Sequence, residues 1–325
     1  MRAPDRERGA ALLTVLLMVA IISVLAAAAL EKLRLSTRLA GNAGATEQAR
    51  AYAIAAETLA TVRIDALLAN QPDRITLAGG WSGRPFSLPV PGGLATARVR
   101  DGGNCFNLNG LVTQTGPGVY AAAPDQVRQF ARLMRLIGVP AQNGESIAAA
   151  AADWIDSDSA PSPGGAEDAS YGGGDPPYRT ANTLMADPSE LRAVLGMTPA
   201  IYAQLRPWVC TLPQARPGQI NVDTLAPEQA PLVAALAPER VSVDQVRAAL
   251  LGRPPQGYAS AGDFWKAPAL ATSGFDGSAQ SAVKTGWFAL DVDVAFGDAR
   301  LEEHGLIDAT RLPSRLVSRQ WGEAS

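Results

Sequence analysis

The chain has 325 residues, and 47% of them are hydrophobic, which excludes a wholly disordered protein. Lys and Arg number 28 against 31 Asp and Glu, a formal net charge of −3, and so slightly acidic a chain is a poor candidate for a nucleic-acid-binding protein. A single histidine, His304, argues against a His-rich metal site and against a Ser-His-Asp triad.

An uncharged apolar segment runs from Gly9 to Leu30. As a helix, residues 10–30 would be about 31 Å long, enough to cross a hydrocarbon core of about 30 Å. Arginines at positions 2, 6 and 8 precede it, which favours a cytoplasmic N-terminus. Two interpretations compete, a cleaved secretory signal and an uncleaved membrane helix. The uncleaved helix is favoured, because the apolar segment is longer than a usual signal core and continues into a helical pattern over 31–69, with no proline before Pro72.

The residues Arg6-Glu7-Arg8-Gly9, followed directly by the apolar run, resemble the start of a type IV pilin or pseudopilin. The resemblance implies that prepilin peptidase cuts after Gly9, so that 1–9 is a leader peptide and Ala10 is the first, methylated residue of the mature chain. It also implies that 10–30 anchors the chain in the inner membrane, with the body in the periplasm, and that the amphipathic continuation of the helix lies on a small sheet. The apolar positions of that continuation are Leu33, Leu35, Leu39, Ala53, Ile54, Ala56, Leu59, Val62, Leu67 and Leu68.

The fifth residue after Gly9 is Thr14, where major pilins and most pseudopilins have glutamate. A carboxylate in hydrocarbon is costly unless it is paired, and in the family this glutamate pairs with the N-terminal amine of a neighbouring subunit. A subunit at a filament tip has no subunit above it to pair with. The absence of this glutamate is a trait of the K-type minor pseudopilins of type II secretion, and in this respect the sequence resembles them.

Beyond the long helix, strand patterns flank a helical region. Alternation and turn residues predict strands at 84–90, 94–100, 287–296, 300–309 and 314–321. Helical periodicity predicts helices at 125–138, 145–155, 189–196, 198–209, 226–237 and 242–252, with a short turn near 263–266. With the resemblance, this predicts an α+β fold: a long N-terminal helix lies on a small antiparallel sheet, which a large all-α insertion interrupts. The chain is predicted to divide into the leader 1–9, a transmembrane helix 10–30, a first pseudopilin-domain segment 31–110, the helical insertion 111–282 and a second pseudopilin-domain segment 283–325.

Six carboxylates lie between positions 153 and 175 with no intervening lysine or arginine: Asp153, Asp156, Asp158, Glu167, Asp168 and Asp175. They would repel one another unless solvated or bridged, and oxygen ligands from a Gly/Pro-rich loop suit Ca²⁺. The loop is not an EF-hand, because Pro161 stands where that motif needs glycine. A glycosidase acid–base pair is disfavoured, since nothing places two carboxylates across a cleft. A solvated acidic loop stays open as the alternative to a metal site.

This loop also resembles the acidic, calcium-binding loop of the K-type subunits. The resemblance implies a calcium cofactor, with the ligands Asp156, Asp158, Glu167, Asp168 and Asp175. Asp153 is expected to cap a helix or to face solvent, while Tyr178 and Arg179 are expected to pack and pair locally.

The two cysteines, Cys105 and Cys210, lie in no CxxC motif. Composition alone allows two free thiols in a cytosolic protein or one disulfide in a body outside the cytoplasm. The segments 103–109 (GNCFNLN) and 207–210 (PWVC) match positions of the K-type family. The resemblance therefore implies a Cys105–Cys210 disulfide that closes a loop of about 100 residues.

Residues 220–226 resemble the opening of a helix-hairpin-helix, but the glycine hairpin that would hold a DNA phosphate is missing, so we expect no nucleic-acid partner. The resemblance implies a minor pseudopilin, not an enzyme, at the tip of the type II secretion pseudopilus, where it would initiate or cap assembly for the export of folded proteins across the outer membrane. The implied partners are minor pseudopilins of the I and J types, prepilin peptidase, the inner-membrane secretion platform and the membrane. The alternatives are a minor pilin of a type IV pilus and a cleaved periplasmic calcium-binding protein.

Overall fold

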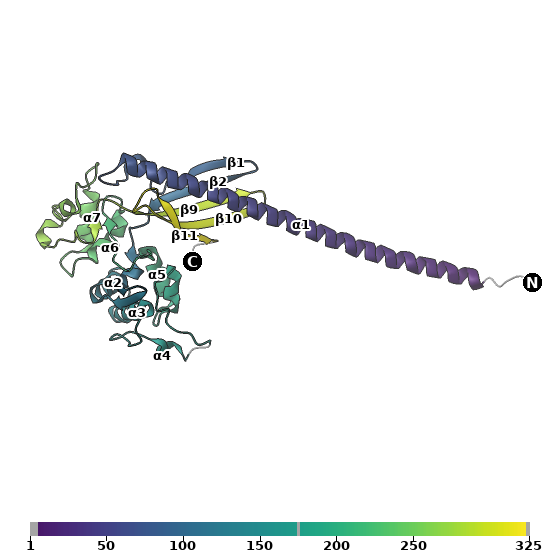
Figure 1. Cartoon of the computed structure of the whole chain (residues 1–325), viewed down its shortest axis with the longest axis horizontal. Coiled ribbons are helices and arrows are strands. Elements are labelled where there is room, and N and C mark those ends of the chain that lie inside the picture. The colour runs from purple at the N-terminus through teal and green to yellow at the C-terminus, as the bar shows by residue number, and fades with distance from the viewer. Residues whose placement is uncertain (1–5, 174–175, 323–325) are drawn as a thin grey trace, which may run out of the picture.

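A single helix, α1 (Arg6–Asn70), projects from the body of the molecule as a rod, and its N-terminal end lies far from every other element (Figure 1). The computed structural model describes residues 6–173 and 176–322, with side chains from residue 10 onward. Because α1 is unbroken, the predicted apolar segment and the predicted continuation form one helix. This confirms the expectation of a long N-terminal helix.

Five antiparallel strands form the main sheet, in the order β1-β2-β9-β10-β11. The predicted strands are all present as β1 (Phe86–Val90), β2 (Gly93–Asp101), β9 (Trp287–Phe296), β10 (Ala299–Asp308) and β11 (Arg315–Trp321). Central strands β2 and β9 are neighbours in the sheet although most of the chain separates them in sequence.

The chain leaves the sheet after Asp101 and returns to it at Trp287. Asp101 faces Phe288 in the antiparallel register, and the N–H of Gly102 donates to the carbonyl of Trp287 over 2.9 Å. Exit and entry are therefore adjacent, so everything between them, residues 102–286, is attached to the sheet by two neighbouring strand ends. We call this segment the insert.

The helix α1 packs on the sheet through small residues. Four alanines and one isoleucine of α1 are almost fully buried: Ala49, Ala53, Ala56, Ala60 and Ile64. They pack against the inner face of β9, where Phe288, Leu290, Val292 and Val294 are buried, as their alternation predicted. Several of the larger predicted positions, Leu33, Leu35, Leu39, Ile54 and Val62, are instead exposed. The predicted apolar face of the helix was thus partly wrong. The face that contacts the sheet is formed mainly by alanines, whose small side chains let the helix approach the sheet closely.

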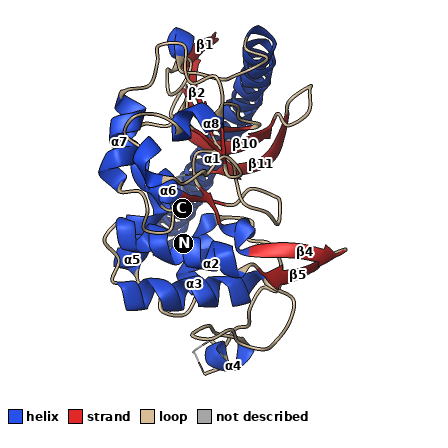
Figure 2. Cartoon of the chain, turned by 90° about the vertical axis from the view of Figure 1, so that its left-hand side faces the viewer, coloured by secondary structure: helices blue, strands red, loops and turns tan. Residues whose placement is uncertain are grey.

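A separate hydrophobic core fills the insert, and the figures show its helices beyond the C-terminal end of α1 and below the sheet (Figures 1 and 2). Its helices are α2 (Pro124–Leu136), α3 (Ala141–Ile155), α4 (Asp168–Tyr171), α5 (Pro199–Leu205), α6 (Ala230–Ala234), α7 (Val243–Leu251) and α8 (Ala261–Trp265). Helices α2 and α3 pack against each other, and stacked rings of Phe106 and Phe130 lie 4.8 Å apart beside them.

The insert is not all helical, which corrects the sequence-based expectation. A hairpin, β4 (Val112–Gly116) and β5 (Val119–Ala122), projects from it, as Figure 2 shows. Two short parallel pairs join β3 (Phe106–Asn107) to β6 (Val209–Cys210) and β7 (Ile220–Asn221) to β8 (Ser281–Ala282). The helix expected at 189–196 is a 3-10 helix over Pro188–Ala193. The strands of the two parallel pairs have two residues each, which is too short to produce a periodic pattern in the sequence.

Candidate functional site

The acidic loop connects α3 to α4, and a buried carboxylate organises it. Asp153, in the last turns of α3, is fully buried and its Oδ2 accepts hydrogen bonds from the N–H groups of Ser162 (3.0 Å) and Ala166 (2.8 Å). A Cβ at Gly165 would collide with that oxygen, so only glycine fits there. The expectation that Asp153 caps a helix or faces solvent was wrong, because this side chain folds the loop from inside.

Three predicted ligands lie together in this loop. One carboxylate oxygen from each of Asp156, Asp158 and Glu167 lies within 4.8 Å of the others. Asp156 and Glu167 are buried, and each has one oxygen without a hydrogen-bond partner, Oδ1 and Oε1 respectively. Buried carboxylate oxygens without partners are costly. Converging oxygens of this kind are the donor set that Ca²⁺ prefers, so the residues present fit the ion.

The electrostatics of this cluster favour a cation. Burial raises the pKa of the Asp156 carboxyl to about 7, with the negative charges of Asp158, Asp153 and Glu167 acting in the same direction. Burial likewise raises the pKa of Glu167, although a hydrogen bond from the Thr180 hydroxyl (3.2 Å) opposes this. A bound divalent cation would reverse both effects, because it favours the ionised carboxylates.

Asp168, a further predicted ligand, is held by neighbours in the loop instead. Asp168 Oδ1 accepts a hydrogen bond from the N–H of Thr180 (3.0 Å) and shares the Thr180 hydroxyl proton with Glu167, lying 2.9 Å from that oxygen, and Arg179 lies 3.8 Å from its other carboxylate oxygen. Asp175 lies outside the described residues. Tyr178 contacts the ring of Tyr171 at 5.2 Å and donates to the carbonyl of Ala193, which is the local packing that we predicted.

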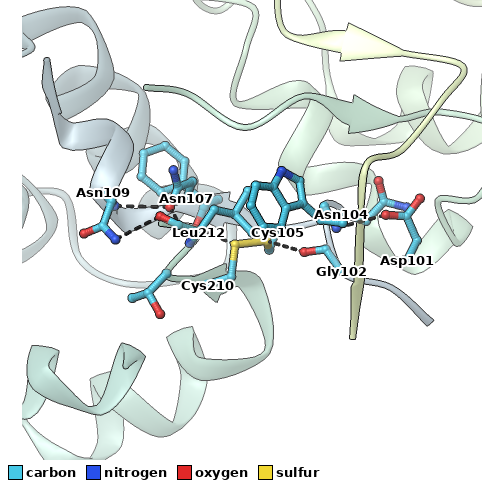
Figure 3. The surroundings of a disulfide bond; sticks show 12 residues. Asp101, Gly102, Asn104, Cys105, Asn107, Asn109, Cys210 and Leu212 are labelled. Atoms are coloured by element: carbon cyan, nitrogen blue, oxygen red, sulfur yellow. Dashed lines mark hydrogen bonds between the residues drawn. A yellow bond between two sulfur atoms is a disulfide. The ribbon is translucent and has the colours of Figure 1, made fainter. Parts of the chain in front are cut away.

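A disulfide joins Cys105 to Cys210, with 5.8 Å between their Cα atoms, as the resemblance implied (Figure 3). It lies beside the β3–β6 pair, in which Asn107 faces Cys210. The first turn of the insert is thereby tied to a segment 105 residues further along the chain.

Three buried asparagines on the same segment, Asn104, Asn107 and Asn109, were missed as a functional group. Asn107 donates to the carbonyls of Gln214 (3.1 Å) and Arg216 (2.9 Å) and accepts from the N–H of Leu212. Asn109, also labelled in Figure 3, donates to the carbonyls of Met185 (2.9 Å) and Leu212 (3.0 Å) and accepts from the Met185 N–H at 2.8 Å. Their spacing, N-x-x-N-x-N, was the available signal.

Asn104 extends this network to the sheet. Its amide donates to the Thr224 hydroxyl over 2.9 Å, and that hydroxyl donates to Asp101 at the end of β2 over 2.5 Å. Its Oδ1 accepts from the N–H of Asn221, whose amide reaches the carbonyl of Ile75 beyond α1 over 2.9 Å. Hydrogen bonds through Thr224 and Asn221 therefore connect Asn104 of the insert to the sheet and to the segment that follows α1.

The N-terminal half of α1 is the other functional element. It is long and apolar enough to cross a membrane, with a mean hydropathy of 2.8 over its most apolar window, none of which is buried. Its large side chains, from Leu12 to Leu30, are exposed along the rod. The Thr14 hydroxyl donates to the carbonyl of Ala11 over 2.8 Å, so this position needs no partner from another subunit. Such an exposed apolar rod is unstable in water and requires a bilayer or other helices around it.

Comparisons with known proteins identify relatives along almost the whole chain. The family described as "Type II secretion system (T2SS), protein K" matches residues 104–214 and 220–285. Proteins named type II secretion system protein K from Pectobacterium carotovorum and Klebsiella pneumoniae are each 35% identical, over 98% of this chain and 97% of the relative. The crystal structure of the GspK–GspI–GspJ complex from enterotoxigenic Escherichia coli contains a chain with 32% identity and a TM-score of 0.75; the match covers 85% of this chain and 96% of that one.

Proposed function

The chain belongs to the protein K family of the type II secretion system, and from this premise we propose that this minor pseudopilin occupies the tip of the pseudopilus and there initiates or caps its assembly. Two observations support the tip position. The insert adds its mass beyond the end of α1 that is far from the anchor (Figure 1), where a further subunit would have to stack. Thr14 satisfies its hydroxyl within its own helix, so no subunit above is needed to pair with it.

We propose minor pseudopilins of the I and J types as its partners. The support is that a related chain was crystallised in a complex with GspI and GspJ. Prepilin peptidase and the inner-membrane platform follow from the same family assignment, and the family relatives favour secretion over the type IV pilus alternative. The work is mechanical, so we propose no enzymatic activity.

Labelling tests the tip position. An epitope inserted at Gly118, the exposed turn between β4 and β5, would be detected by immunogold on sheared pseudopili. We expect one label at one end of each filament, whatever its length. The same epitope in the major pseudopilin is the control and should label the whole length. If the epitope at Gly118 of this chain were detected along the whole filament, the tip position would be contradicted.

For the anchor, we propose an inner-membrane span with the body in the periplasm. Mass spectrometry of the mature chain should find an N-methylated Ala10. A chain that begins near Glu31 would instead support the alternative, a freely diffusing periplasmic calcium-binding protein. The disulfide Cys105–Cys210 supports an oxidising compartment for the body.

We further propose that the acidic loop binds calcium through Asp156, Asp158 and Glu167, with Asp168 and Asp175 as further ligands. The ion would neutralise the repelling carboxylates and so hold the loop against α3. It is a structural element here, and the chain's own contribution is the preorganisation that Asp153 provides.

Calorimetry and thermal unfolding with added CaCl₂ test this site. A free Ca²⁺ concentration of 100 times the dissociation constant should raise the free energy of unfolding by about 2.7 kcal/mol. The double variant Asp156→Asn/Asp158→Asn should lose both the binding heat and the stabilisation. Asp298→Asn, an exposed carboxylate in the β9–β10 turn, is the matched control and should retain both. Equal, negligible binding by the wild type and the double variant would leave only a solvated acidic loop.

A further inference from the structure

A cavity of about 390 Å³ lies between the last turns of α1 and the start of β1. Its floor is apolar: Ile64 and Val99 are buried, and Leu67 and Phe86 are half-buried. A volume near the lower end of the range of ligand pockets suits one or two large side chains rather than a cofactor.

One wall of the cavity is fixed in place. The Trp81 indole N–H donates to the carbonyl of Thr76 over 2.7 Å, and its ring packs edge-on against Phe288 at 5.6 Å. The preceding Gly79 and Gly80 have φ values of +80° and +62°, and nothing lies within 4 Å of where a Cβ would stand. The tryptophan wall is therefore preformed, while the rim beside it stays open.

Two arginines border this apolar floor, and none of the described residues that line the cavity carries a carboxylate. The Arg63 guanidinium lies over the Phe86 ring, 4.1 Å from its centre. Arg84 is exposed at the rim. Among the side chains that the structure describes, those of residues 10–173 and 176–322, no ion pair joins either arginine to an acidic residue, in contrast to Arg98 and Arg100 on the neighbouring strand. An anion beside an apolar group would complement this arrangement.

The cavity also adjoins a free sheet edge. Strand β1 lies at the edge of the sheet, and within the described part of the chain β2 is the one strand that pairs with it. Pro89 in β1 has no N–H to donate, so an extended peptide could pair with this edge only over the residues before it, while one of its side chains enters the cavity. This edge favours a peptide over a small apolar acid as the occupant.

We propose that this cavity docks an extended segment of a partner protein, with a Leu, Ile, Phe or Trp side chain on the apolar floor and a neighbouring Asp or Glu paired with Arg84. The cavity is lined by the last turns of α1 and by residues of β1 and β2, whereas the acidic loop lies between α3 and α4, and Figure 1 shows these two groups of elements apart from each other. The docking proposal therefore depends neither on the tip position nor on calcium binding.

A phage-displayed library of random dodecapeptides, selected on the full chain in lipid nanodiscs and cleared against empty nanodiscs, tests this docking site. Enriched peptides should carry Asp or Glu within two residues of a large apolar side chain. As synthetic peptides they should bind the Arg84→Gln variant at least tenfold more weakly than wild type. Because Arg84 is exposed and unpaired over the described residues, this variant should fold normally.

The matched control is Arg240→Gln, since Arg240 is also an exposed arginine, but on the insert. Its affinity for the same peptides should stay within twofold of wild type. Three results would overturn the proposal: no enrichment above empty nanodiscs, enrichment of peptides that lack acidic residues, or equal affinities for wild type and Arg84→Gln.

Discussion

Replacing Asn109 by alanine should strongly destabilise the insert. The Asn109 side chain is fully buried and makes three hydrogen bonds of 2.8 to 3.0 Å, all to backbone groups of Met185 and Leu212. Both of these residues are themselves buried, at 2% and 1% exposure, so water cannot replace the lost side chain. The substitution would leave the N–H and the carbonyl of Met185 unsatisfied, while the carbonyl of Leu212 would keep its hydrogen bond from the N–H of Gln214.

Each buried polar group that loses its partner costs about 1–3 kcal/mol. Two such groups give an expected loss of about 2–6 kcal/mol in the free energy of unfolding. That is a large fraction of the stability of an ordinary domain. Asn109→Asp should be no better, because its second oxygen would face the carbonyls of Met185 and Leu212 where the amide now donates.

Urea unfolding of the full chain in detergent micelles, followed by tryptophan fluorescence, measures this loss. Trp154 and Trp265 are both buried in the insert and report on it. The control is Asn143→Ala, because Asn143 is exposed on α3, and its effect should stay within about 0.5 kcal/mol. If Asn109→Ala were no more destabilising than this control, the buried asparagine network would not hold the insert together.

The other predictions concern the sheet and the disulfide. Burial and the nearby Glu57 charge raise the pKa of the Glu303 carboxyl to about 7, so the folded chain holds this proton more tightly than the unfolded chain. Stability should therefore fall as the pH rises from about 4.5 to about 7, and between pH 5 and pH 8 the wild type should lose more unfolding free energy than Glu303→Gln; parallel curves would refute this. Ala53→Leu should cost about 1–3 kcal/mol by forcing α1 off the sheet, whereas Ala55→Leu on the exposed face should change little in the same urea assay. Replacing Cys105 and Cys210 by serine should lower the thermal midpoint, with a loss of at most about 4.7 kcal/mol in the chain-entropy model; an unchanged midpoint would mean that the asparagines alone close this loop.

Local sequence determined the elements whose signal is periodic and long. The uncharged run before Leu30 required a membrane-length helix, and strict alternation from Trp287 to Phe296 required a strand with one buried face. The acidic loop could also be predicted, because a Gly/Pro-rich segment with six carboxylates and no intervening Lys or Arg stands out by composition alone. In each case neighbours along the chain carry the information, so no knowledge of distant contacts was needed.

Tertiary structure alone decided how these elements meet. Asp101 and Trp287 are far apart in sequence, and only strand pairing shows that the insert leaves and re-enters the sheet at adjacent positions. The burial of Asp153 and the convergence of the ligands around Asp156 depend on how the loop folds back on α3. The sequence by itself therefore established an anchored helix, a sheet and a helical region, while the junction that joins them depends on buried hydrogen bonds between segments about 100 residues apart, which leave no periodic trace in the chain.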